Sequence, residues 1–273
     1  MIVVRNGSLT VFRSALYKTT SSVIQTGDMV LVVDPCWLPD EVEDIRRHTA
    51  DIAGGKPVYV LFTHSDYDHI IGGGAFPGAR TIASAAFANK SGEDKEQIVE
   101  QIRTFEDEYY IERGYPIGYP DIDHVIERDG QTLEVGDTRL TFYLSPGHNP
   151  DGLYTIVEPL GYLLAGDYFS DIEFPYIYHD SRLYETSIGK LDAMMAAHSL
   201  RLLIPGHGAP TDDAGEMVRR QQKDLAYIAA MRAAVEKGDQ AAIDGLIDGC
   251  PFPRNMRKFH RDNQRLFERE MNQ

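Results

Sequence analysis

Basic residues are few in this chain. Its 273 residues include 27 Lys and Arg against 42 Asp and Glu, so the formal net charge is −15 at pH 7. A surface with this charge repels the phosphates of nucleic acids and of anionic lipids. We therefore expect no nucleic acid and no membrane as a partner, and a small molecule as the substrate.

Cysteine is scarce, and long apolar runs are missing. The two cysteines, Cys36 and Cys250, are far apart in sequence and fit reduced thiols better than a disulfide. The first residues lack the apolar stretch of a secretory signal, and no later run has the length that spans a bilayer. These absences predict a cytoplasmic protein, and they leave its oligomeric state open.

Several common catalytic motifs are also missing. The sequence has no Gly-x-Ser-x-Gly motif, no Gly-rich phosphate loop, and no His close in sequence to either cysteine. It also has no internal repeat and no flexible linker. We expect no organic cofactor and no serine or cysteine nucleophile.

The most informative stretch that is present runs from Val58 to Gly74. It starts with a short run of β-branched and large apolar residues, which predicts a buried strand. Two imidazoles and two carboxylates follow within six residues, at His64, Asp66, Asp68 and His69. Such groups are costly to bury without a counter-charge, so they favour a divalent metal site over a solvated turn rich in Asp and His.

Three further apolar runs end in a possible metal ligand. His148, Asp167 and His207 each follow such a run and are each directly preceded by a glycine. Glycine lets the backbone turn sharply without a Cβ penalty. The repeated order of strand, turn and ligand indicates several strand ends that converge on one site.

In order and context these motifs resemble those of the metallo-β-lactamase superfamily, from about Met29 to His207. The usual signature of that family is His-x-His-x-Asp-His, followed by a separate His, a bridging Asp and a last His. This chain carries a His-x-Asp-x-Asp-His variant, because residue 66 is Asp. The resemblance implies two divalent metal ions, zinc first, with manganese or iron as alternatives. It places His64, Asp66 and His148 on one ion, Asp68, His69 and His207 on the other, and Asp167 between them.

The resemblance also implies the fold. We expect an α/β protein with the four-layer αβ/βα sandwich of the metallo-β-lactamase fold, as a single domain over residues 1–273. A helical and Tyr-rich insertion is expected at about 88–128, and C-terminal helices at about 212–273. Hydrophobic periodicity and turn signals predict individual elements as well. Helices are expected at 39–53, 92–113, 188–199 and 255–270, and strands at 57–63, 79–84, 131–135, 138–144, 153–157, 162–165 and 200–204.

The expected activity is metal-dependent hydrolysis of a small ester, lactone, thioester or amide by a metal-bridging hydroxide. Asp68 would orient this nucleophile as well as bind metal. A phosphodiesterase acting on a small substrate is the first alternative, although no Arg and Lys clamp for phosphate accompanies the motifs. A di-iron redox protein is the second, and it would need a separate flavin partner.

Other residues are assigned roles around this site. In the resembling family an Asp at the end of the strand before the first ligands supports the metals, and Asp34 stands there, where a structural turn would also suit it. His260 on the last helix is expected at the rim of the site, in contact with substrate or a ligand carboxylate. The Tyr-rich segments 109–119 and 168–184 suit either a substrate pocket or ordinary packing. Asp66 is expected to make the site less positive than a His would.

Overall fold

The computed structural model describes residues 1–272, and the chain divides into two compact units. The first unit contains Met1–Leu144 and Leu153–Leu160. The second contains Ser145–Gly152 and the residues from Gly161 onward. The single domain expected over residues 1–273 stays a prediction beside this division.

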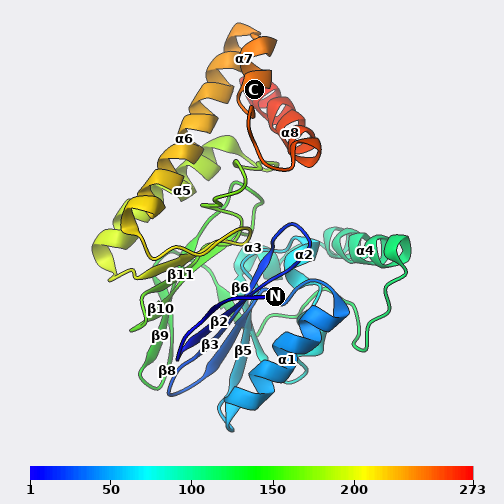
Figure 1. Ribbon diagram of the computed structural model, residues 1–273, viewed down its shortest axis with the longest axis vertical. Helices are drawn as coiled ribbons and strands as arrows, with labels where there is room; N and C mark the ends of the chain where they lie inside the picture. The colour runs from blue at the N-terminus through cyan, green and yellow to red at the C-terminus, as the bar shows by residue number, and fades with distance from the viewer. Residues whose placement is uncertain (273) are drawn as a thin grey trace. The chain divides into compact units, whose positions relative to one another are not determined.

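A seven-stranded sheet forms the centre of the first unit (Figure 1). Its strands lie in the order of the chain, the first four antiparallel and the last four parallel. Its central strands are buried along almost their whole length, as expected for their unbroken apolar runs. The strands are β1 (Ile2–Arg5), β2 (Leu9–Arg13), β3 (Thr20–Gln25), β4 (Val30–Val33), β5 (Val58–Leu61), β6 (Arg80–Ser84) and β7 (His124–Ile126).

Helix α1 (Pro39–Ala53) connects β4 to β5 and packs on the first sheet. It matches the predicted range, beginning at a proline and ending before Gly54, which has a φ of 55° that suits glycine. Val42 and Ile45 on one face of α1 are buried. Trp37, Phe62 and Phe87 are among the large side chains of the core beneath this sheet.

Three more α-helices and a short 3-10 helix at Gly73–Ala75 belong to the described part of the first unit. The one-turn helix α2 (Tyr67–Ile70) follows β5, and α3 (Ala85–Ala88) follows β6. Helix α4 (Gly92–Tyr109) lies beside α2 (Figure 1) and ends four residues earlier than predicted. It ends there because Tyr110 adopts a left-handed φ of 54°, and the Ile111 amide then bonds to the Glu106 carbonyl.

Five strands make up the second sheet. In the first unit β8 (Gln131–Val135), β9 (Thr138–Leu144) and β10 (Leu153–Glu158) form an antiparallel meander close to its predicted bounds. In the second unit β11 (Tyr162–Leu164) and β12 (Leu202–Ile204) pair in parallel.

Helix α5 (Ser181–Ala197) connects β11 to β12 and begins seven residues before the predicted start. The carboxylate of Asp180 caps it by accepting from the backbone of Arg182 and Leu183. The predicted start of this helix was wrong because Asp180, which lies within the Tyr-rich segment 168–184, was not recognised as its N-terminal cap.

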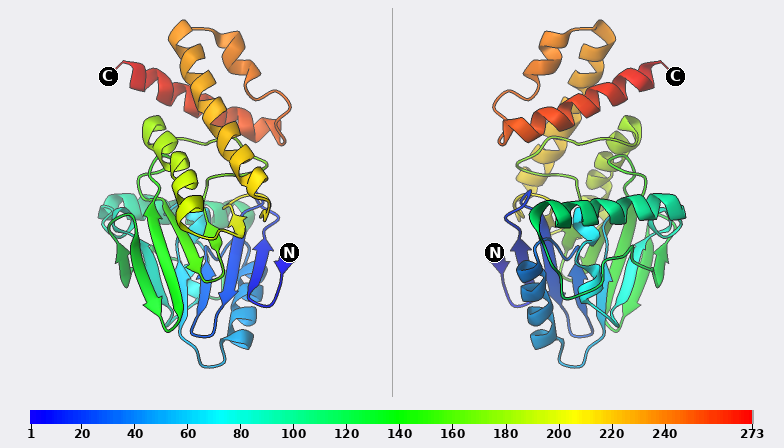
Figure 2. Two further views of the ribbon diagram at one scale, coloured as in Figure 1. Left: turned by 90° about the vertical axis from the view of Figure 1, so that its left-hand side faces the viewer. Right: turned by 90° about the vertical axis from the view of Figure 1, so that its right-hand side faces the viewer.

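The C-terminal helices are α6 (Ala214–Lys237), α7 (Gln240–Gly245) and α8 (Pro253–Met271), and both α7 and α8 pack on α6 (Figure 2). Met217, Ile228 and Met231 of α6 are buried. Among the described residues, none of the helices combines the length and the apolarity needed to cross a bilayer.

Candidate metal centre

Four of the expected ligands lie together in the first unit, where β5 ends. His64 follows the strand, and Asp66 stands at the N-terminal cap of α2, which carries Asp68 and His69 in its single turn. This short segment therefore carries two carboxylates and two imidazoles, of which Asp68 and His69 lie in the helical turn itself. The rings of His64 and His69 are buried, with centroids 4.0 Å apart.

The carboxylate of Asp34, at the end of β4, orients both histidines. Asp34 Oδ2 accepts from Nδ1 of His69 at 2.9 Å and from the Thr63 hydroxyl at 2.5 Å. Since the Thr63 proton is used in that bond, its oxygen accepts from Nδ1 of His64 at 3.0 Å. Both neutral rings then carry their lone pair on Nε2, the arrangement found behind metal-binding histidines. These bonds place Asp34 where the predicted supporting role requires it, and they add Thr63 as a partner.

The second unit brings together His148, Asp167 and His207. Leu164 of β11 pairs with Ile204 of β12, and each ligand comes three residues after its member of this pair. Parallel strands in register therefore deliver Asp167 and His207 side by side. Gly206 is required between them, since a Cβ there would lie 2.3 Å from Asp167 Oδ1.

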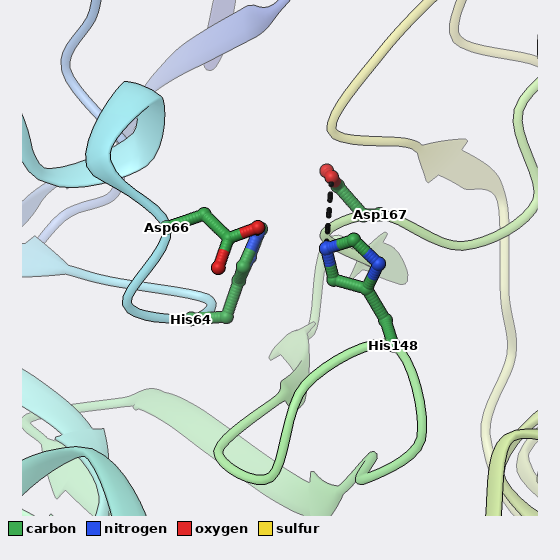
Figure 3. Close-up of side chains that lie close together, drawn as sticks. All are labelled: His64, Asp66, His148 and Asp167. Atoms are coloured by element: carbon green, nitrogen blue, oxygen red, sulfur yellow. Dashed lines mark ion pairs between the residues drawn. The ribbon is translucent and has the colours of Figure 1, made fainter. Parts of the chain in front are cut away.

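Each oxygen of Asp167 lies against a different histidine. Oδ2 is 3.3 Å from His148 Nε2, and Oδ1 is 3.2 Å from His207 Nε2. Figure 3 shows the first of these ion pairs as a dashed line, with His64 and Asp66 of the first unit also drawn. A carboxylate engaged in this way could offer one oxygen to each of two ions.

The distances between donor atoms fit metal binding within each unit. Two ligands about 2.1 Å from one tetrahedral ion are themselves about 3.4 Å apart. In the first unit His64 Nε2 is 3.7 Å from Asp66 Oδ2, and His69 Nε2 is 3.5 Å from Asp68 Oδ2. Nitrogen and carboxylate oxygen at these separations suit zinc, and they also suit manganese or iron.

His148 is held from both its backbone and its ring. Its Nδ1 donates to the Tyr176 carbonyl at 2.7 Å, which makes Nε2 the lone-pair nitrogen. Its backbone amide donates to the Tyr168 hydroxyl at 3.1 Å, and that hydroxyl donates to the Ser145 carbonyl at 2.8 Å. Burial raises the pKa of Tyr168 well above its usual range, so its hydroxyl keeps the proton that this bond requires.

Asn263 of α8 fixes the segment that carries the Tyr176 carbonyl. Its Oδ1 accepts from the Ile177 amide at 2.8 Å, and its Nδ2 donates to the Pro175 carbonyl at 2.6 Å. Nδ2 also donates to the Tyr227 hydroxyl at 2.9 Å. The sequence does not predict this role, because nothing local relates residue 263 to residue 176.

His260 does not lie where the sequence analysis expected. Its ring is buried, with Nδ1 bonded to the Tyr227 hydroxyl at 2.8 Å and Nε2 donating to the Ile243 carbonyl at 2.9 Å. Both nitrogens are thus engaged by partners that are not ligand carboxylates. We correct the expectation: His260 does not contact a ligand carboxylate but joins α6, α7 and α8 through these two bonds, with its ring edge-on to that of Phe174.

The tyrosines of segment 168–184 mainly pack the second unit. Tyr168 and Tyr184 are buried and stack with centroids 4.4 Å apart. Tyr176 and Tyr178 lie edge-on to the His148 ring, at 5.8 and 4.9 Å. Ordinary packing therefore accounts for two of the four tyrosines, and the other two contact the ring of a candidate metal ligand.

Comparison with protein families identifies the chain. The model of the metallo-β-lactamase superfamily matches residues 16–216. The chain belongs to this superfamily. The predicted resemblance and fold class are thereby confirmed, while none of the curated proteins compared with the chain matches it.

Solved structures agree on the fold. A metallo-β-lactamase family protein from Thermus thermophilus is 21% identical over 84% of this chain and 82% of its own, with a TM-score of 0.61. An archaeal superfamily protein from Sulfolobus tokodaii is 17% identical over 81% of this chain and 86% of its own, with a TM-score of 0.53. A stereoselective inverting sec-alkylsulfatase from a Pseudomonas species is 13% identical over 98% of this chain but only 50% of its own, with a TM-score of 0.69.

Proposed function

We propose that this metallo-β-lactamase superfamily protein is a metal-dependent hydrolase that binds two divalent ions, with zinc as the native metal. The observation that carries the proposal is the engagement of the two Asp167 oxygens by two different histidines. The donor groups that support it are His64, Asp66, His148 and Asp167 for one ion, and Asp68, His69 and His207 for the other.

Two such ions, when bound, supply an acidified water and polarise the bond that it attacks. The residues of the chain then have separate tasks. Asp34 and Thr63 keep the protons of His64 and His69 on Nδ1. The second oxygen of Asp68 orients the attacking water and accepts its proton.

The substrate in this proposal is a small ester, lactone, thioester or amide. The net charge of −15 supports a small molecule over nucleic acid. Phosphodiesters belong in the substrate panel because the same ion arrangement serves phosphoryl transfer, and alkyl sulfates because a sec-alkylsulfatase shares the fold.

The first experiment measures metal content and hydrolysis together. We expect about two ions per chain in protein purified without added metal, and turnover of chromogenic esters that a chelator abolishes. Asp167→Asn, which keeps the shape and removes the charge, should lower both. Asp107→Asn is the matched control on the exposed face of α4 and should lower neither. A wild-type protein that binds no metal, or an Asp167→Asn variant that behaves like the control, would overturn the proposal.

The second experiment tests Asp66, which makes the proposed site less positive by one charge than a His there would. A less positive site attracts anionic substrates less, and oxygen ligands favour manganese and iron relative to an imidazole-rich site. Asp66→His should therefore shift the relative affinities towards zinc and raise kcat/KM for anionic over neutral esters. Unchanged metal preference and unchanged substrate charge preference would show that Asp66 lies outside the ligand set.

A further inference from the structure

A groove of about 940 Å³ lies on the first unit beside the metal-ligand loop. Residues of α4 contribute most of its lining, and Tyr67 of α2 lines it as well. Because Tyr67 stands between Asp66 and Asp68 in the chain, the groove begins at the ligand loop itself. We call it the α4 groove and define it by Tyr17, Tyr67, Glu100, Phe105, Glu108 and Tyr109.

Aromatic rings form much of its surface. Tyr17 and Tyr109 are 46% and 59% exposed, although both are large apolar side chains. Tyr67 and Phe105 are half-buried between them. Exposed aromatic groups that gather in one concavity mark a binding surface.

The charge of the groove is negative. Of its twelve lining residues, all within the described part of the chain, none is Lys or Arg, whereas Glu100 and Glu108 are both present. Arg103 on the same helix bonds to Glu96 at 2.5 Å and to Glu100 at 3.3 Å, so it offsets one of the rim charges. Glu108 forms no ion pair within the described residues. An anionic ligand would meet uncompensated charge here.

We propose that the α4 groove binds the positively charged, apolar group of an organic cation, such as a quaternary ammonium group. Aromatic faces attract such a group through their electron-rich centres, and the two carboxylates add Coulomb attraction. The position beside the ligand loop makes this group part of the substrate, a step that rests on the hydrolase proposed above.

Trp37 provides a test that is independent of catalysis and of metal. It is the only tryptophan of the chain, and its ring lies 5.7 Å from Tyr17, 5.3 Å from Tyr67 and 5.0 Å from Phe105. A ligand that contacts these three rings should change Trp37 fluorescence. Titration of metal-free protein with choline and with its neutral isostere 3,3-dimethylbutan-1-ol gives the two affinities to be compared.

We expect choline to bind about five-fold or more tightly than the isostere, as cation–π attraction predicts. Glu108→Gln and Tyr109→Leu should each lower this preference. Their matched controls are Glu112→Gln and Tyr110→Leu, which change the same residue types outside the groove and should retain the preference. Equal affinity for the two compounds, or equal losses in variants and controls, would overturn the cation site.

The substrate assignment is tested with acetylthiocholine and 3,3-dimethylbutyl thioacetate, which differ only in charge. A lower KM for the cationic thioester, lost in Tyr109→Leu but not in Tyr110→Leu, supports it. Choline binding without hydrolysis of either thioester overturns the substrate assignment and counts against the proposed hydrolase, while the cation site stands. Hydrolysis with equal KM values supports the hydrolase and overturns the assignment of the groove to the substrate.

Discussion

Asn263→Ala should weaken metal binding at His148 from a distance. The side chain is fully buried, and its loss leaves the Ile177 amide and the Pro175 carbonyl without their partner. Each buried orphan costs about 1–3 kcal/mol, so the free energy of unfolding should fall by about 2–6 kcal/mol. The Tyr176 carbonyl lies between these two anchors and accepts from His148 Nδ1. Loss of such an outer partner typically lowers metal affinity by about 10–100-fold.

The control for this prediction is Tyr227→Phe. It removes the hydroxyl that bonds to Asn263 Nδ2 and His260 Nδ1, but it keeps both anchors of the loop. Urea denaturation measures the stability of both variants, and competition with a chromogenic chelator measures zinc affinity under conditions where circular dichroism shows both to be folded. We expect both variants to lose stability and only Asn263→Ala to lose affinity. Equal zinc affinities would refute the reasoning, since the loop would then hold His148 without α8.

Three further predictions concern other parts of the second unit and the metal. Asp224 is buried, and burial raises its pKa to about 8. Between about pH 4 and 8 its carboxyl group therefore ionises in the unfolded chain but not in the folded one, so the free energy of unfolding should fall as pH rises through this range. Asp224→Asn should remove this slope, which urea denaturation at pH 5 and 9 would detect. Gly206→Ala should abolish metal binding because its Cβ would strike Asp167, whereas Gly189→Ala, with nothing within 4 Å, should not alter metal content. Removal of metal should lower Tm. Zinc at about a thousand times its Kd should then raise the free energy of unfolding by about 4 kcal/mol. An unchanged free energy of unfolding would show that the ions do not bind the native state.

The ligand segment of the first unit could be predicted because its information is local. His64 to His69 are contiguous, and the strand before them is a single apolar run. The helical turn α2 within this segment was not among the predicted helices. The support from Asp34 came from a resemblance, since 35 positions separate it from His69.

Residues with the same local pattern can have different environments, which is why other predictions failed. His260 and Asn263 are one turn apart on α8, and both are buried. The histidine seemed the better functional candidate because imidazole binds metals and moves protons. In the structure the histidine joins helices. The asparagine holds the loop behind His148, a candidate metal ligand, because an amide can accept from one backbone group and donate to another.

Helix α6 also has buried polar side chains that bond to backbone groups, and its sequence did not predict them. Periodicity placed apolar residues towards the core, yet Arg220 and Asp224 are also buried. Arg220 donates to the carbonyls of Phe169 and Ala209, so it holds the segments that follow two strand ends. No pattern in α6 alone could show this, because the acceptors are backbone groups of irregular segments that need partners.

The residues that orient the candidate metal ligands lie partly inside and partly outside the range that the family model matches. In the first unit, His69 is oriented by Asp34, a residue inside the matched range of 16–216. In the second, His148 is oriented by a carbonyl whose loop is fixed by Asn263, a residue beyond that range. A carboxylate bonded to an imidazole orients the ring and adds a negative charge behind it. A backbone carbonyl only orients the ring, and it does so only while its loop keeps its position. The C-terminal helices are for this reason expected to matter for the proposed site, since deleting them would remove the group that anchors the loop behind His148.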